Sequence, residues 1–212
     1  MIKNSFNFLF KNKKIREEVF QSNTSFNKVE NLATFFKKMK LSLFIYVVML
    51  ASITICSLFQ LNVLAIKPLD FDSLWNIGTS WLTHENFEHY KNNMIILSQL
   101  LLVFLLVEKN KSILILLILF SGFFTWLLGG SGLHLGASGL IFALIGYMFL
   151  SIFRNIWYLI FIIVMSSQLF YIVFHGLIPS QEISFSGHFG GFISGLLIAY
   201  FANKNRKNIS LF

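Results

Sequence analysis

Ser138 lies between small residues at the start of an apolar run that continues to Phe153. The tetrapeptide around it is Gly136-Ala137-Ser138-Gly139. Small residues and hydroxyl groups are common where membrane helices touch. A serine on a tight turn can instead be a nucleophile, with glycines that clear space beside it. Because motifs this short often match by chance, the tetrapeptide alone favours close packing.

Two histidines and an asparagine precede the second apolar run. A zinc-protease helix carries two histidines at i and i+4, whereas His84 and His89 are spaced i and i+5. In a helix this spacing turns the second imidazole about 140° away from the first, which argues against a metal pair. His89 and Asn93 are spaced i and i+4 and share a helix face. They form either a structural polar patch or a pair of donors aimed at one point, as in an oxyanion hole.

The last apolar run begins at His188 and carries a stripe of glycines. Gly187, Gly191 and Gly195 recur every four residues, a spacing that lets a neighbouring backbone approach closely. Parallel packing against the run that follows Ser138 would place His188 beside the serine, where its imidazole could act as a general base. That run offers three small contact residues, Gly139, Ala143 and Gly146.

The composition places these residues in a membrane protein. Of 212 residues, 56% are hydrophobic and 12% are charged, about half the charged fraction of a soluble domain. We therefore predict an all-α, polytopic membrane protein. A membrane span needs about 20 apolar residues. Six segments reach or approach that length: 41–65, 93–108, 112–130, 136–153, 156–175 and 188–203.

The basic residues predict an orientation and argue against a nucleic-acid partner, because they flank apolar segments, where they orient membrane proteins. With the N-terminus inside, 15 of the 17 Lys and Arg residues are cytoplasmic, and only Lys67 and Lys91 lie outside. We therefore expect both termini in the cytoplasm. The predicted parts are a basic, aromatic juxtamembrane segment at 1–40, a six-helix core at 41–203 and a basic tail at 204–212.

In their order and spacing, the three groups resemble the motifs of the rhomboid intramembrane serine proteases. The family pattern is a histidine, four residues, a second histidine, three residues and an asparagine. Gly-x-Ser-Gly follows, and then a small residue, His, x, Gly, Gly, three residues and Gly. The resemblance covers roughly residues 41–203 and implies a six-helix bundle without the seventh helix of some members. The matching residues are His84, His89 and Asn93, then Gly136 to Gly139, then Gly187 to Gly195.

The resemblance implies a role for each matching residue. Ser138 would be the nucleophile and His188 its general base, in a dyad without a carboxylate. The backbone N–H of Ser138, with His89 and Asn93, would stabilise the oxyanion of the tetrahedral intermediate. His84 would be structural and would order the long first loop.

Three positions depart from the family pattern, and the mildest departure is Gly187 in place of the commoner alanine. Trp75 matches the first residue of a Trp-Arg pair in the first loop, but Asn76 replaces the arginine. Phe142 stands where many members have a tyrosine that packs on the catalytic imidazole; a phenyl ring can stack there but donates no hydrogen bond. Besides His84 and Phe142, the residues with expected loop or packing roles are Trp75, Gly136, Gly139 and Gly191.

The resemblance implies hydrolysis of a peptide bond in or near a transmembrane segment, through an acyl-enzyme at Ser138. The implied substrates are single-span membrane proteins with a small residue before the scissile bond. The lipid bilayer is the other implied partner, and no metal or organic cofactor is implied. We expect a bacterial plasma (inner) membrane location.

Two other functions are compatible with the sequence. A catalytically silent rhomboid-like pseudoprotease would bind membrane clients without cutting them. The intact Ser138 and His188 argue against it, while the departures at Asn76 and Phe142 leave it open. A small transporter or channel would use the intramembrane histidines, but the chain has no internal repeat of the kind that transporters carry.

Overall fold

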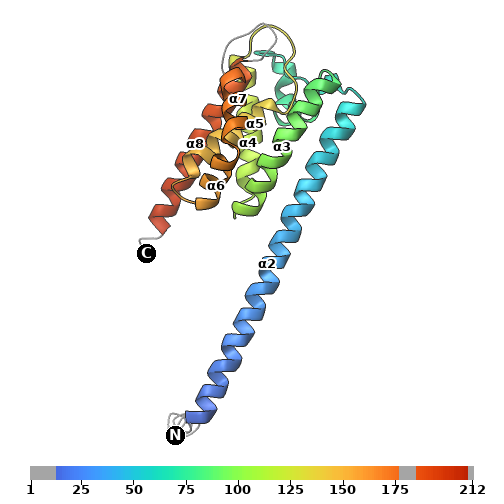
Figure 1. Ribbon diagram of the computed structural model, residues 1–212. Coiled ribbons are helices and arrows are strands. Elements are labelled where there is room, and N and C mark those ends of the chain that lie inside the picture. Colours follow the sequence, from blue (N-terminus) through green and yellow to red (C-terminus); the bar gives the residue numbers. More distant parts are fainter. Residues whose placement is uncertain (1–12, 177–184, 210–212) are drawn as a thin grey trace. The chain divides into compact units, whose positions relative to one another are not determined.

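The structure consists of helices joined by short connections (Figure 1). The computed structural model describes residues 13–176 and 185–209. Within these residues there is no strand, only an isolated antiparallel bridge between Ile66 and His134. The all-α prediction is confirmed. In chain order the elements are α2 (Lys13–Leu58), the 3₁₀ helices η1 (Asn62–Leu64), η2 (Phe71–Gly78) and η3 (Ser80–Leu82), α3 (Phe87–Val107), α4 (Ser112–Leu128), α5 (Ser138–Ser151), α6 (Ile156–Val164), α7 (Ser166–Gly176) and α8 (Phe185–Ile209).

Three helices are long and apolar enough to cross a membrane. They are the Asn31–Leu58 part of α2, the whole of α3, and the Phe185–Lys204 part of α8. The consecutive helices α6 and α7 pass the same test together, as one bent pair. Helices α4 and α5 are apolar but only 17 and 14 residues long, shorter than the roughly 20 residues that a straight span needs. The chain is therefore a multi-pass integral membrane protein, whereas the number of six spans stays a prediction.

The first helix differs from the span predicted over 41–65. Helix α2 begins at Lys13, within the predicted juxtamembrane segment, and ends at Leu58. Its end is set by Gln60, which adopts a left-handed φ of 48° and donates its N–H to a carbonyl of the last helical turn, a common way for a helix to stop. The chain divides into two units, Met1–Ser42 and Leu43–Phe212, and every contact described below lies within the second.

The segment predicted as a span over 156–175 is not one continuous helix. The chain forms α6 and α7 instead, with an 80° bend between them. Met165 is the C-terminal cap of α6, and its N–H donates to Phe161 O. The predicted spans over 93–108 and 188–203 correspond to α3 and α8, which both begin earlier, and α8 also extends into the predicted tail.

Helix α5 is the centre of the bundle and packs against α8, α4 and α3 (Figure 1). Every residue from Leu140 to Met148 is buried. A helix that is apolar on all sides is buried among other elements, so α5 is enclosed by protein along most of its length. Ser138, its first residue, lies just before this enclosed stretch and is half-buried.

The glycine stripe on α8 packs on α5 as predicted. A Cβ atom on Gly191 would overlap the carbonyl oxygen of Gly139, and one on Gly195 would overlap that of Ala143. Backbone contact this close requires glycine at both positions of α8. Because the contact positions increase together along both helices, α5 and α8 run parallel, and their N-terminal ends meet.

Candidate functional site

Ser138 follows a tight turn that only glycine can form. Gly136 has φ +115°, a left-handed conformation that a side chain makes costly. A Cβ atom there would also lie 2.8 Å from His89 Cε1. The N–H of Gly136 donates to Ser80 O at 3.0 Å and fixes the turn to the first loop. Since the first N–H groups of a helix have no intrahelical acceptor, the N–H of Ser138 is available to a ligand.

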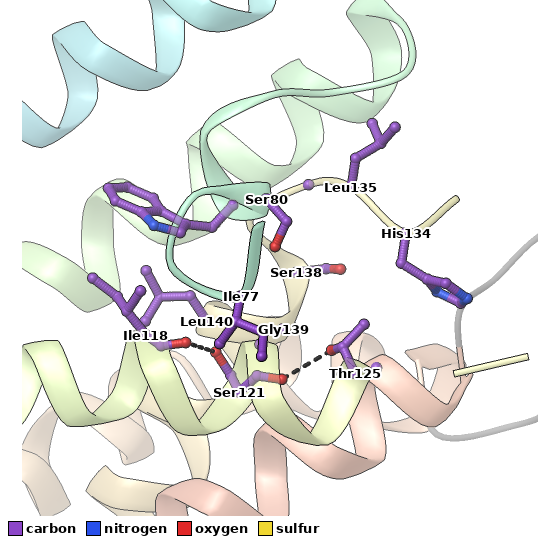
Figure 2. A pocket seen from close by; sticks show the side chains of 14 residues that line it. Ile77, Ser80, Ile118, Ser121, Thr125, His134, Leu135, Ser138, Gly139 and Leu140 are labelled. Carbon is purple, nitrogen blue, oxygen red and sulfur yellow. Dashed lines mark hydrogen bonds between the residues drawn. The ribbon is translucent and has the colours of Figure 1, made fainter. Parts of the chain in front are cut away.

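An open pocket lies beside the Ser138 side chain (Figure 2). Its walls come from the first loop, α4, the glycine-rich turn and the start of α5, with Gly187 from α8. In Figure 2 the hydroxyl group of Ser138 points into this space between Ser80 and Thr125. The polar residues around the pocket are Ser80, Trp81, Ser121, Thr125, His134 and Ser138.

His188 is held on α8 by two contacts. Its Nδ1 lies 2.9 Å from the carbonyl oxygen of Gly176, and its ring stacks on Phe142 at 4.4 Å between centroids. A carbonyl oxygen only accepts, so Nδ1 carries the proton and Nε2 carries a lone pair. Within the described residues no hydrogen bond joins His188 to Ser138.

Asn93 and His89 both lie against the turn that precedes Ser138. A Cβ on Gly136 would be 3.0 Å from His89 Nε2 and 3.4 Å from Asn93 Nδ2. Asn93 is 7% exposed, and its Nδ2 has no hydrogen-bond partner among the described residues. A buried amide donor without an acceptor is costly and calls for an explanation. The turn before Ser138 therefore has an unpartnered amide donor and an imidazole against it.

His84 lies outside the helix that carries His89, so the helical spacing argument does not apply to this pair. Helix α3 begins only at Phe87, and the two imidazoles meet edge to face at 5.2 Å. His84 Nδ1 lies 3.0 Å from Ser57 Oγ, and Nε2 accepts the N–H of Ala137 at 3.2 Å. Burial, and secondarily the nearby His89, lower the pKa of His84 to about 3, so the ring is neutral at physiological pH.

The first-loop residues Trp75 and Asn76 lie in η2 and do not line the pocket, although their neighbour Ile77 does. The Trp75 side chain is 88% exposed. Asn76 donates from Nδ2 to Val63 O at 3.0 Å and to Ala65 O at 2.7 Å. Its amide therefore ties η2 to the preceding segment, at the position where the family commonly has arginine.

Some pocket residues were not predicted from the sequence. Ser121 and Thr125 present hydroxyl groups one helical turn apart on α4, and Thr125 donates to Ser121 O (Figure 2). Two hydroxyl residues at i and i+4 in an apolar run are a signal that could have identified this wall. His134, which the motifs leave without a role, also lines the pocket. No group of three or more His, Cys, Asp or Glu side chains suited to a metal ion occurs among the described residues.

Comparison with known proteins finds one family model and several relatives that are similar in sequence to this chain. A family model described as the Rhomboid domain matches residues 72–205. Uncharacterized proteins of Mycobacterium tuberculosis and Mycobacterium bovis are each 31% identical to this chain over 161 residues, covering 66% of this chain and 64% of theirs. An uncharacterized protein of Mycobacterium leprae is 31% identical over 149 residues, covering 64% of this chain and 59% of its own length. The chain thus spans less than two thirds of these relatives.

Proposed function

We propose that this chain, which belongs to the rhomboid family, is an intramembrane serine endopeptidase with Ser138 as nucleophile and His188 as general base. It would hydrolyse peptide bonds in or near the transmembrane segments of membrane proteins. The single observation that carries the proposal is the hydrogen bond from His188 Nδ1 to Gly176 O.

That hydrogen bond supports the role of His188 because it selects the tautomer. In serine hydrolases with a triad, a carboxylate holds the imidazole so that Nε2 can take the serine proton. Here the Gly176 carbonyl takes that place, and the Phe142 ring holds the face of the imidazole. The parallel packing of α5 and α8 supports the same assignment, because it brings the N-terminal ends of both helices together.

The proposed oxyanion site uses the donors around Gly136. The N–H of Ser138, the amide Nδ2 of Asn93 and the imidazole of His89 would face the carbonyl oxygen of a bound substrate. The absence of a partner for Asn93 Nδ2 among the described residues supports this role. Donors that are already in place cost no reorganisation when negative charge develops on the substrate oxygen.

The proposed reaction has two halves. In the first, Ser138 Oγ attacks the scissile carbonyl carbon and gives its proton to His188 Nε2. The C–N bond then breaks, and the leaving amine takes that proton. In the second, water attacks the acyl-enzyme, transfers a proton to the same Nε2 and releases the new carboxyl terminus as the proton returns to Ser138.

The length of α5 supports a site below the membrane surface. Its 14 residues span only about 21 Å at 1.5 Å per residue, less than the ~30 Å of a hydrocarbon core. A hydrolytic site at that depth needs water, and the hydroxyl-lined pocket beside Ser138 would supply it. We also propose cytoplasmic termini, the domain limits predicted above, and a bacterial inner membrane, in agreement with the bacterial relatives.

Labelling by a fluorophosphonate probe in membranes tests the proposal. The wild-type protein should be labelled, and both Ser138→Ala and His188→Ala should not. Ser98→Ala is a suitable control, because that hydroxyl donates to a carbonyl of its own helix. Wild-type protein that stays unlabelled, or equal labelling of the Ser138→Ala variant, would contradict the protease proposal and favour a pseudoprotease.

A further inference from the structure

His84 connects the end of α2 to the residue that precedes Ser138. Its Nδ1 lies 3.0 Å from Ser57 Oγ, on the last turn of α2. Its Nε2 lies 3.2 Å from the backbone nitrogen of Ala137. Both His84 and Ala137 are almost fully buried, at 1% and 0% exposure. Two parts of the chain that are 80 residues apart are thus joined through one imidazole.

The hydrogen-bond roles in this connection follow from the chemistry of the partners. The Ala137 N–H can only donate, so Nε2 accepts and Nδ1 carries the proton. Nδ1 therefore donates to Ser57 Oγ. The titratable groups that face the ring are His89 and Tyr90 of α3, at 5.2 and 5.7 Å between centroids.

The residue before Ala137 gives this hydrogen bond its importance. Gly136 has no side chain to restrict its backbone, so the peptide plane between residues 136 and 137 can rotate at little cost. An acceptor for the Ala137 N–H holds that plane in one orientation. Because this peptide plane is fixed, the N–H of the next residue, Ser138, also has a fixed direction.

We propose that His84, anchored by Ser57, is a positioning residue that holds the Gly136–Ala137 peptide so that the Ser138 N–H and hydroxyl face the pocket. The end of α2, which lies outside the matched motifs, thereby helps to support the turn that carries the nucleophile. This role rests on the proposed protease function, but the contact itself can be tested without catalysis.

Two measurements test the proposal on the full-length protein in detergent. The first is hydrogen–deuterium exchange of the peptide containing Ala137, measured in a Ser138→Ala background. Adding Ser57→Ala or His84→Leu should raise the exchange rate of this amide at least about tenfold, because a buried hydrogen bond is lost. Adding Ser52→Ala should not change it, since Ser52 lies on the same helix and donates to Val48 O of that helix.

The second measurement is the fluorophosphonate labelling rate of variants that keep Ser138. His84→Leu should label about 10²-fold more slowly, the scale expected when a reacting group is misplaced. His84→Gln should recover most of that rate, because its amide oxygen can still accept from Ala137. A residue that only fills space would not be rescued by an acceptor in this way.

The outcomes separate the two proposals. Unchanged exchange at Ala137 in both Ser57→Ala and His84→Leu would overturn the positioning role, whether or not the protein is a protease. Equal labelling of His84→Leu and His84→Gln, with thermal unfolding midpoints that match, would also overturn it. Absence of labelling in the wild type, with the exchange changes present, would overturn only the protease function.

Discussion

Phe142 stacks on His188, with ring centroids 4.4 Å apart and planes inclined by 13°. Phe142 lies one helical turn after Ser138, so this contact holds the imidazole over the start of α5. Gly176 packs against both rings: a Cβ there would overlap the Phe142 ring and lie 3.1 Å from His188 Nδ1. In the proposed dyad, a ring face and a backbone carbonyl would hold the imidazole as a carboxylate does in a triad.

The first prediction concerns Gly176. Gly176→Ala should displace the Phe142 ring and the imidazole together, and should lower the fluorophosphonate labelling rate by about 10²-fold. Gly130→Ala is the control, because a Cβ there meets nothing within 4 Å. Labelling of Gly176→Ala at the wild-type rate would show that the stack does not position His188.

The second prediction separates activity from stability at Asn93. Asn93→Ala should reduce labelling by about 10²–10³-fold, as loss of one oxyanion donor does. Its thermal unfolding midpoint should hardly change, because the amide Nδ2 has no partner among the described residues to lose. The exposed neighbour Asn92 provides the matched control, Asn92→Ala. A large fall in the unfolding midpoint without a loss of labelling would assign Asn93 a structural role instead.

The third prediction concerns the contact between α5 and α8. Gly191→Ala places a methyl group against the carbonyl of Gly139, and overpacking of this kind costs about 1–3 kcal/mol. We expect a lower unfolding midpoint and slower labelling, measured by a thermal shift assay and by the probe. Gly78→Ala should alter neither, since its Cβ would make ordinary contact with Leu119 at 3.7 Å. Full stability and activity of Gly191→Ala would contradict the close-packing explanation.

The fourth prediction is a pH dependence of stability through His84. Its pKa is lowered from 6.5 to about 3 in the folded protein, so the unfolded chain binds a proton between these values and the folded one does not. The contribution of neutral His84 to the free energy of unfolding is complete above pH 6.5. It is lost as the pH falls towards 3, by about 1.4 kcal/mol per pH unit. Denaturant titrations from pH 7.5 to 4.5 should therefore show a weaker decline for His84→Gln than for wild type. Parallel declines would exclude this contribution of His84.

The fifth prediction concerns a buried ion pair near the far ends of α3 and α5. Glu108 is 2% exposed, and its carboxylate accepts from Arg154 at 2.6 Å and from Tyr147 at 2.5 Å. Removal of one partner of a buried pair costs about 3–5 kcal/mol, so Arg154→Met should strongly lower the free energy of unfolding.

The exposed pair between Lys91 and Glu88 offers the comparison for this fifth prediction, with side chains that are 46% and 69% exposed. Glu88→Gln should cost less than about 1 kcal/mol. If denaturant titration showed similar losses in the free energy of unfolding for Arg154→Met and Glu88→Gln, burial would not explain the strength of the Glu108–Arg154 pair.

The sequence by itself determined the class of the protein, the approximate place of its apolar helices and the three polar motifs. These are local properties, because hydropathy, glycine spacing and i, i+4 relations are defined by neighbours along the chain. The glycine stripe on α8 was also readable, since a four-residue repeat fixes one helix face whatever lies opposite.

Tertiary structure alone decided how the motif residues are held. The carbonyl that receives His188 Nδ1 comes from Gly176 on α7, a residue without a distinctive side chain. The partners of His84 lie 27 and 53 positions away, and no periodic pattern reports contacts over such separations. The bend between α6 and α7 was likewise invisible to hydropathy, because both halves are apolar. Local physics therefore places the chemical groups on their helices, and packing between distant segments gives each one its partner.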